Sequence, residues 1–251
     1  MEYLVFQLYG PLASWGETAI GETRPSGFYP SRSALIGLVA AALGVERSDA
    51  AAQEHLRSSL GFAVKTCIHG DLLRDYHTAQ MPSRSKASHY QTRRDELGLA
   101  KQDLNTVLSS RDYRMDGFWV VALWLKQPGD LTLEALAEKL RKPVFMPYLG
   151  RKACPVALPF SPIQVAGSLR QALDSEFPPL LKSHQQDHYY LKNTQTVTYI
   201  WEGEADALGN AEQVQSRHVW DEPISRQPWQ FGQRLEHQLV IREDTHVPVE
   251  N

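Results

Sequence analysis

The chain has 251 residues, 42% of them hydrophobic and 22% charged, which is typical of a folded globular protein and excludes a largely disordered chain. No apolar run approaches the ~20 residues that a membrane-spanning helix needs, so we expect no contact with a membrane. The net charge of −3 does not by itself indicate a partner, and the two distant cysteines suggest neither a disulfide framework nor a zinc site.

Turn residues and apolar spacing divide the first part of the chain into strands and helices. Gly10 and Pro11 end the first strand and begin a loop rich in glycine, proline, arginine and aromatic residues. Ser31 is a suitable helix N-cap, and apolar residues recur at helical spacing after it until Gly44. We expect strands at residues 3–9 and 62–68 and helices at residues 31–44 and 49–60.

Residues 71–114 differ from the rest of the chain. They are polar and basic, without a helical or strand period long enough to form core. Two Arg-Asp-Tyr tripeptides bracket the segment, at residues 74–76 and 111–113. We interpret it as an insertion that protrudes as a hairpin or thumb.

The elements after the insertion complete a recognisable order. An apolar strand at residues 118–125, an amphipathic helix at 131–140 and a strand at 144–146 give strand–helix–strand–strand–helix–strand. That order predicts an α+β fold of the ferredoxin-like type, which RNA-recognition modules share. We expect this domain at residues 1–155 and a smaller, β-rich C-terminal part at 156–251. Its predicted elements are a helix at 168–175, strands at 196–201 and 237–241, and loops at 203–215 and 220–232.

Positive charge is concentrated in two segments that contain no Asp or Glu. Residues 139–173 carry six Lys or Arg and residues 77–94 carry four, whereas residues 201–251 have a net charge of −6. The negative charge of the acidic segment therefore cancels the positive charge of the basic ones in the net charge of the chain. Such a local concentration indicates a polyanionic partner, and nucleic acid is the one we expect.

Three segments carry the residue types that contact nucleic acid. Glycines let a backbone approach phosphates, arginines supply charge and forked donors, and exposed aromatic rings stack on bases. The candidate residues are Trp15, Arg24 and Arg32 in the N-terminal loop and at the start of the first helix, where the helix dipole would favour a phosphate; His77, Arg84, Lys86, Arg93 and Arg94 in the hairpin; and Gly150, Arg151 and Lys152 in a turn.

Each of these segments also has a structural interpretation. The loop could be an ordinary strand-to-helix connection that buries Trp15 and Phe28. The hairpin could be a solvated basic surface, and the turn an ordinary charged turn. These alternatives remain open at the level of the sequence.

Catalysis is the remaining possibility that the residues suggest. His77 could act as a general base in metal-independent RNA cleavage, supported by Tyr76, Lys86 or Lys101. The histidines at 184 and 188 could share a helix face, but no third ligand lies near them, so we expect neither a metal nor another cofactor.

Seven blocks along the chain carry a family resemblance. They are GPLASWG at residues 10–16, TRPSG at 23–27, PSRS at 30–33, LIGL at 35–38, RDYHT at 74–78, VALWL at 121–125 and PYLGRKACP at 147–155. In this order they resemble the CasD family, the subunit of the type I-E CRISPR Cascade complex that holds the 5′ handle of the guide RNA. Residues 221–223 and 226–231 fit the C-terminal part of that family.

The resemblance implies a modified RNA-recognition fold with a hairpin thumb roughly at residues 77–110. It implies a non-catalytic subunit of an antiviral ribonucleoprotein complex in the cytoplasm. Its partners would be the CRISPR guide RNA, CasC-type backbone subunits whose filament it caps, and the CasA-type large subunit, with target DNA met only through the complex. Related type I-C subunits cleave RNA with a Tyr, a Lys and a His, but this chain has no adjacent Lys-His pair.

Overall fold

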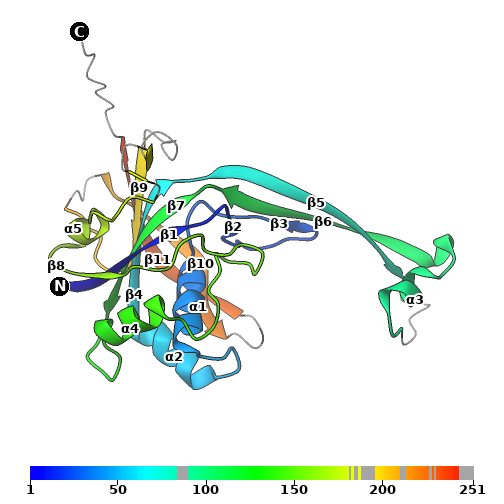
Figure 1. Ribbon diagram of the computed structural model, residues 1–251, viewed down its shortest axis with the longest axis horizontal. Helices are drawn as coiled ribbons and strands as arrows, with labels where there is room; N and C mark the ends of the chain where they lie inside the picture. The colour runs from blue at the N-terminus through cyan, green and yellow to red at the C-terminus, as the bar shows by residue number, and fades with distance from the viewer. Residues whose placement is uncertain are drawn as a thin grey trace, which may run out of the picture.

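The computed structural model describes residues 1–83, 90–180, 182–183, 186–187, 196–209, 213–225, 228 and 230–242. The fold is α+β with mostly antiparallel sheets, and one strand pair projects far from the body (Figure 1). The strands are β1 (Glu2–Tyr9), β2 (Leu12–Ala13), β3 (Thr23–Arg24), β4 (Leu60–Ile68), β5 (Asp71–Pro82), β6 (Leu104–Met115), β7 (Phe118–Leu125), β8 (Ile163–Ala166), β9 (Thr196–Trp201), β10 (Gln215–Ser225) and β11 (Gln230–Arg242). The helices are α1 (Arg32–Leu43), α2 (Ala50–Ser59), α3 (Arg93–Leu97), α4 (Leu133–Arg141), α5 (Leu169–Leu173) and the 3₁₀ helix η2 (Lys101–Asp103).

The body is built on one seven-stranded sheet. Its strand order is β10-β11-β9-β4-β7-β1-β8, and each neighbouring pair is antiparallel. Along the chain, β1, α1 with α2, β4, β7, α4 and β8 follow the order strand–helix–strand–strand–helix–strand. The ferredoxin-like classification itself stays a prediction.

The strand expected at residues 144–146 is wrong, and β8 is the next strand of the body instead. The backbone amides of Val144 and Phe145 donate to the carbonyls of Ala42 and Ala41, at 3.1 and 2.9 Å. These carbonyls belong to the last turn of α1, where the helix itself supplies no i+4 amide donors for them. The segment therefore satisfies a helix end and does not join a sheet.

The C-terminal strands continue the sheet of the N-terminal part. β8 pairs with β1 and β9 pairs with β4, so strands from both sides of the boundary predicted at residue 155 share one sheet. The loop expected at residues 220–232 is also wrong, because its ends belong to β10 and β11, which pair with two register shifts. Irregular pairing of this kind disturbs the alternation by which strands are recognised.

Two hydrophobic cores lie on the two faces of the sheet. In β1, Leu4 and Phe6 point into the core covered by α1 and α4, whereas Tyr3 and Val5 point into the core covered by α5. Alternate side chains of a strand face opposite sides of the sheet. Because both faces are covered here, β1 is apolar at its odd-numbered and its even-numbered positions. Ser31 caps α1 as expected, since its side chain accepts from the amide of Ala34. The sheet and helices thus form a rigid base for the projecting strands.

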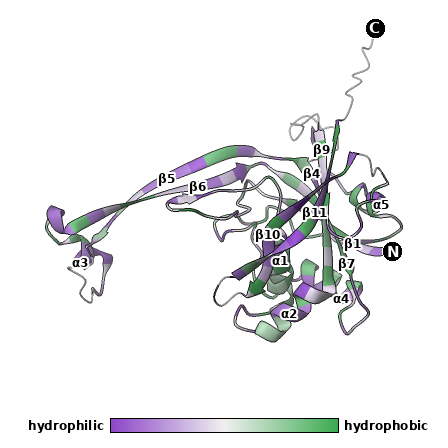
Figure 2. Ribbon diagram, turned by 180° about the vertical axis from the view of Figure 1, so that it is seen from behind, coloured by the Kyte–Doolittle hydropathy of each residue, from purple (hydrophilic) through white to green (hydrophobic). Residues whose placement is uncertain are grey.

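The projecting strands are β5 and β6. They pair without interruption from Asp71 opposite Met115 to Pro82 opposite Leu104, with α3 and η2 near the far end (Figure 1). Most side chains of β5 are exposed, and hydrophilic and hydrophobic positions are mixed along both strands (Figure 2). The pair therefore projects into solvent without a core of its own. Among the residues that the structure describes, no helix is long and apolar enough to cross a bilayer.

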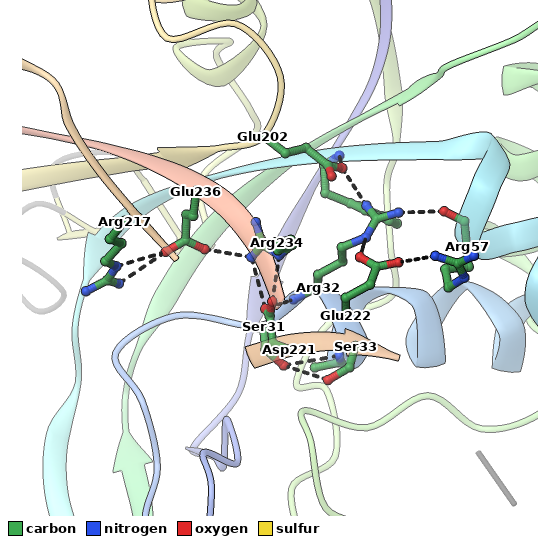
Figure 3. A network of polar contacts seen from close by, with 12 residues as sticks. Ser31, Arg32, Ser33, Arg57, Glu202, Arg217, Asp221, Glu222, Arg234 and Glu236 are labelled. Carbon is green, nitrogen blue, oxygen red and sulfur yellow. Dashed lines mark hydrogen bonds and ion pairs between the residues drawn. The ribbon is translucent and has the colours of Figure 1, made fainter. Parts of the chain in front are cut away.

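A buried ion-pair network joins α1 to the C-terminal strands (Figure 3). The Arg32 side chain is 3% exposed, and its Nη1 and Nε donate to Glu202 and Glu222 at 2.5 and 2.6 Å. Its Nη2 donates to the carbonyls of Arg57 and Leu60 at 2.6 and 3.1 Å. The predicted contact of Arg32 with a phosphate is therefore wrong, because its guanidinium is buried and bound by internal acceptors.

The network extends across β10 and β11. Asp221 accepts from the backbone amide of Arg32 at 2.7 Å and from Nε of Arg234 at 2.6 Å, and Arg234 also binds Glu236 at 2.6 Å. The Tyr29 hydroxyl donates to Glu236 at 2.5 Å. Burial, then the charge of Glu236, raises the pKa of Tyr29, so its phenol stays protonated and continues to donate. Both ends of the loop–helix junction at Ser31 are thereby tied to the C-terminal strands.

We predict that Arg32→Ala lowers the free energy of unfolding by about 3–5 kcal/mol, because it leaves Glu202 and Glu222, whose side chains are only 11% and 13% exposed, without their main partner. Urea denaturation checks this. Lys139→Ala is the matched control, since Lys139 is exposed on α4 and its loss should change stability by no more than about 0.5 kcal/mol. Equal stability of the two variants would contradict a structural role for Arg32.

Candidate nucleic-acid interface

The loop at residues 10–31 folds back onto the base of the β5–β6 pair. Both of its short strands pair with β6, β2 antiparallel and β3 parallel, the latter with Arg24 opposite Arg111. The amide of Trp15 donates to Oγ of Ser26 at 3.0 Å, and the amide of Gly27 donates to the carbonyl of Trp15 at 2.7 Å. The loop is thus an ordered structure pinned to the base of the hairpin.

The turn that carries Gly150 packs directly against this loop. The amide of Ser14 donates to the carbonyl of Leu149 at 2.9 Å. Gly150 has a φ of +87°, and a Cβ at this position would lie 1.8 Å from the carbonyl oxygen of Ser14. Only glycine combines that conformation with so close an approach. The turn therefore presents the half-buried Arg151 and the exposed Lys152 beside the loop.

Arg151 links the turn, the loop and the hairpin. Its Nη2 donates to the carbonyl of Arg24 at 3.4 Å, and its guanidinium lies 5.0 Å from the ring centroid of Tyr113 on β6. Arg24 is exposed, and its own Nη1 donates to the carbonyl of Gly21 at 2.7 Å. Three predicted site residues, Arg24, Arg151 and Lys152, therefore meet at the base of the hairpin although they are distant in sequence.

A buried carboxylate organises the arginines at the base. Asp112 is 5% exposed and accepts from Nε and Nη2 of Arg74 at 2.8 and 3.0 Å. These hydrogen bonds, and the charges of Arg74, Arg114 and Arg151, hold the pKa of Asp112 below its usual value against the opposing effect of burial. Asp112 is therefore ionised at neutral pH, and its charge is directed at the arginines that surround it.

Sequence reasoning did not include Arg74 and Arg111 in the site. They lie in the two Arg-Asp-Tyr tripeptides, which face each other across β5 and β6, with Arg74 opposite Asp112 and Asp75 opposite Arg111. The available signal was the repetition of the tripeptide, since opposite charges in reversed order match an antiparallel register. Arg111 is exposed, next to Arg24, and adds to the positive charge of the base.

Three more of the predicted residues lie farther along the hairpin than this group, although His77 is only two residues beyond Asp75, which faces Arg111. The His77 side chain is 59% exposed, with Nδ1 3.5 Å from Oδ2 of Asp75. Arg93 and Arg94 belong to α3 near the far end, where Arg93 pairs with Glu96 and Arg94 is exposed. The basic residues thus form one group at the base and another near the tip.

One further candidate is wrong, and two cannot be placed. Trp15 is 2% exposed and its ring packs edge-on against Trp119 at 5.1 Å, so it belongs to the core and cannot stack on a base. Like Arg32, it was predicted from residue type, which does not report burial. Arg84 and Lys86 lie outside the described residues.

The chemistry that this arrangement offers is anion binding. Arg24, Arg111 and Lys152 are exposed cations on three segments that the contacts above hold together. Cations from several segments are how proteins follow a phosphate backbone. Within the described parts of the chain, no cluster of three or more His, Cys, Asp or Glu could hold a metal ion.

Comparison with known proteins places these features in a family. The model of the family described as CRISPR-associated protein (Cas_Cas5) matches residues 3–235. The Escherichia coli (strain K12) protein "CRISPR system Cascade subunit CasD" is 35% identical over 167 residues, which cover 62% of this chain and 68% of that protein.

Solved structures agree with that result. One described as a CRISPR RNA-guided surveillance complex matches with a TM-score of 0.64 at 26% identity, over 96% of this chain and 89% of the other. Another, described as the crystal structure of a Cas protein, matches with a TM-score of 0.57 at 24% identity, over 96% and 95% of the two chains. The second likeness concerns the fold alone.

We predict that Gly150→Ala destabilises the protein by at least about 1–2 kcal/mol, because a left-handed conformation is costly for alanine and Ser14 must move as well. Thermal unfolding measures the effect. Gly16→Ala is the control, in the loop against which the turn packs, because an added Cβ there meets nothing within 4 Å. Similar melting temperatures for the two variants would show that the turn does not depend on the close approach.

Proposed function

Because the chain belongs to the CRISPR-associated Cas_Cas5 family, we propose that it is the subunit of a Cascade-type complex that binds the 5′ handle of the guide RNA. The observation that carries this proposal is the meeting of Arg24, Arg151 and Lys152 at the base of a projecting hairpin. A single-stranded RNA that crosses the base would have phosphates within reach of all three segments.

The buried carboxylate of Asp112 supports this role. An exposed acid at the base would repel phosphates, but Asp112 is buried and bound to Arg74. Asp112 therefore does not compete with an external anion for the exposed cations of the base, Arg24, Arg111 and Lys152. Arginine suits such a contact because its planar group can donate two hydrogen bonds to one phosphate.

We assign the β5–β6 hairpin the role of a thumb that holds the guide where the handle meets the spacer. Each strand has 12 residues, so the pair reaches about 40 Å from its base. The exposed ribbon carries polar and charged groups at His77 on β5 and at Arg93 and Arg94 near the tip. Such a ribbon can splay neighbouring nucleobases of a single RNA strand apart and bend that strand, while the base of the hairpin holds its phosphates.

The proposal includes a place in an assembly. As the handle-binding subunit, the protein would end the filament of CasC-type backbone subunits, contact the CasA-type large subunit and meet target DNA only through the complex. It would act in the cytoplasm and would not itself be an enzyme. The family relationship and the likeness to a surveillance complex support this assignment.

We predict that Arg151→Ala combined with Lys152→Ala weakens binding of the guide RNA and lowers the salt dependence of log Kd. Each lost phosphate contact on single-stranded RNA should reduce the slope by about 0.7, so the double variant should lose about 1.4. The measurement is a salt titration of Kd, with RNA co-purified from cells that express a matching CRISPR array.

The matched control removes Lys139 and Lys142, which are exposed in the same acid-free segment but lie in α4 and directly after it. We expect the control to bind as the wild type does. If the Arg151/Lys152 variant keeps the wild-type slope, the base of the hairpin is not the RNA site.

One observation favours a different function, cleavage of CRISPR repeat RNA. His77 lies 3.5 Å from Asp75, a carboxylate that could orient it as a general base. We expect no cleavage when purified protein is incubated with repeat RNA in EDTA, because the chain has no adjacent Lys-His pair to complete the Tyr, Lys and His of cleaving relatives. Metal-free cleavage that His77→Ala abolishes would replace the proposed function with that of an endoribonuclease.

A further inference from the structure

One aromatic ring at the base of the hairpin is exposed although its surroundings hold it in place. Phe28, in the loop before α1, is 52% exposed. Its carbonyl accepts a hydrogen bond from Nε1 of the buried Trp119 at 2.8 Å. The backbone of Phe28 is therefore anchored to the core, while its ring reaches solvent.

Two side chains fix the ring itself. The guanidinium of Arg114 lies over it, 4.1 Å from the centroid, and His69 meets it edge-on, with centroids 5.5 Å apart and planes at 84°. Arg114 is in turn held by hydrogen bonds to the carbonyls of Gly27 and Ser26, each at 3.2 Å. The ring thus has one face covered by a cation, while the residue as a whole stays 52% exposed.

Burial explains why these neighbours support the ring and do not compete for a ligand. Arg114 is 9% exposed, so its charge is directed at the Phe28 ring and the two carbonyls. Burial, and then the charge of Arg114, lowers the pKa of His69, so its imidazole is neutral at physiological pH. Little side-chain freedom remains for Phe28 to lose when a ligand stacks on it, which favours binding.

The position of the ring indicates the class of ligand. Phe28 lies four residues after Arg24 in the same loop, and Arg114 and Arg111 belong to the same strand of the hairpin. The large apolar side chains exposed in the loop at residues 10–31 are Ile20 and Phe28. An exposed ring beside exposed cations is typical of sites where a base stacks while its phosphates are neutralised nearby.

We propose that Phe28 is a stacking platform for one unpaired nucleobase of the bound RNA. The inference rests on the proposed function, because it requires that RNA cross the base of the hairpin. The Phe28 ring would contact the π-face of a nucleobase, whereas the cations of the hairpin base contact phosphates. Stacking of this kind is available to every base, so the platform would position the strand without selecting its sequence.

The test compares Phe28→Ala, Phe28→Trp and Ile20→Ala in the full-length protein. The probe is guide RNA from a matching CRISPR array, measured by Kd at several salt concentrations. Loss of one stacked base should weaken Phe28→Ala by about 5- to 100-fold, whereas Phe28→Trp should bind as the wild type does. The salt slope should stay constant in all three, because no charge is removed. Ile20→Ala controls for the loss of an exposed apolar side chain from the same loop, and we expect it to be neutral.

The Kd values are compared at a temperature at which every variant is folded, because Phe28→Ala also removes the contacts with Arg114 and His69 and should lower the melting temperature slightly. Photocrosslinking with 5-iodouridine at successive positions should give one crosslink that disappears with Phe28→Ala. A Kd of Phe28→Ala within twofold of the wild type overturns the inference, as does equal weakening by Phe28→Trp. If Arg151→Ala with Lys152→Ala still changes the salt slope in that case, the proposed function stands. If the wild type binds no guide RNA, the proposed function fails as well.

Discussion

The buried guanidinium of Arg32 ties the start of α1 to the last strands of the chain. A charge removed from water is tolerated only when its hydrogen bonds are satisfied, and here Glu202, Glu222 and two carbonyls accept them. The loop at residues 10–31 ends at this anchor, and β2 and β3 hold its middle against β6. Because both attachments are fixed, the exposed groups of the loop, Arg24 and Phe28, are presented in one arrangement at the base of the hairpin.

Burial divides the basic residues into two kinds with different roles. Arg32 and Arg114 are buried and bind acceptors within the protein, whereas Arg24 and Lys152 are exposed. The acidic C-terminal segment does more than offset positive charge in the total, because Glu202, within it, is a main partner of Arg32. A cluster of basic residues in a sequence therefore overstates the charge available to a ligand. Only the fraction that remains after internal pairing is available to a ligand.

Elements with strong local signals could be predicted from the sequence. The cap at Ser31 and the apolar runs of β1 and β7 indicated their elements because these signals lie within each segment. β8 was missed because its four residues depend on pairing with the distant strand β1, and β10 was missed because two register shifts against β11 disturb its alternation. The site was predicted in part for the same reason. Residue type and the turn at Gly150 indicated segments that the structure brings together at the base of the hairpin, but the burial of Trp15 and Arg32 depends on contacts with residues far along the chain.

The direction of the hairpin is set by the sheet of the body, from which its two strands emerge. β5 follows β4 and β6 leads into β7, and β4 and β7 are neighbours in the body. Between β4 and β5 stands Gly70, with a φ of +73°, where a Cβ would lie 2.6 Å from the carbonyl oxygen of Met115. The two strands are therefore pressed together as they leave the body, and Arg74 with Asp112 bridges them just beyond this point. A two-stranded ribbon is marginally stable alone, so its order must come from such a fixed base. An RNA held at that base would meet the hairpin at a defined angle, which is the condition for bending a strand at one position.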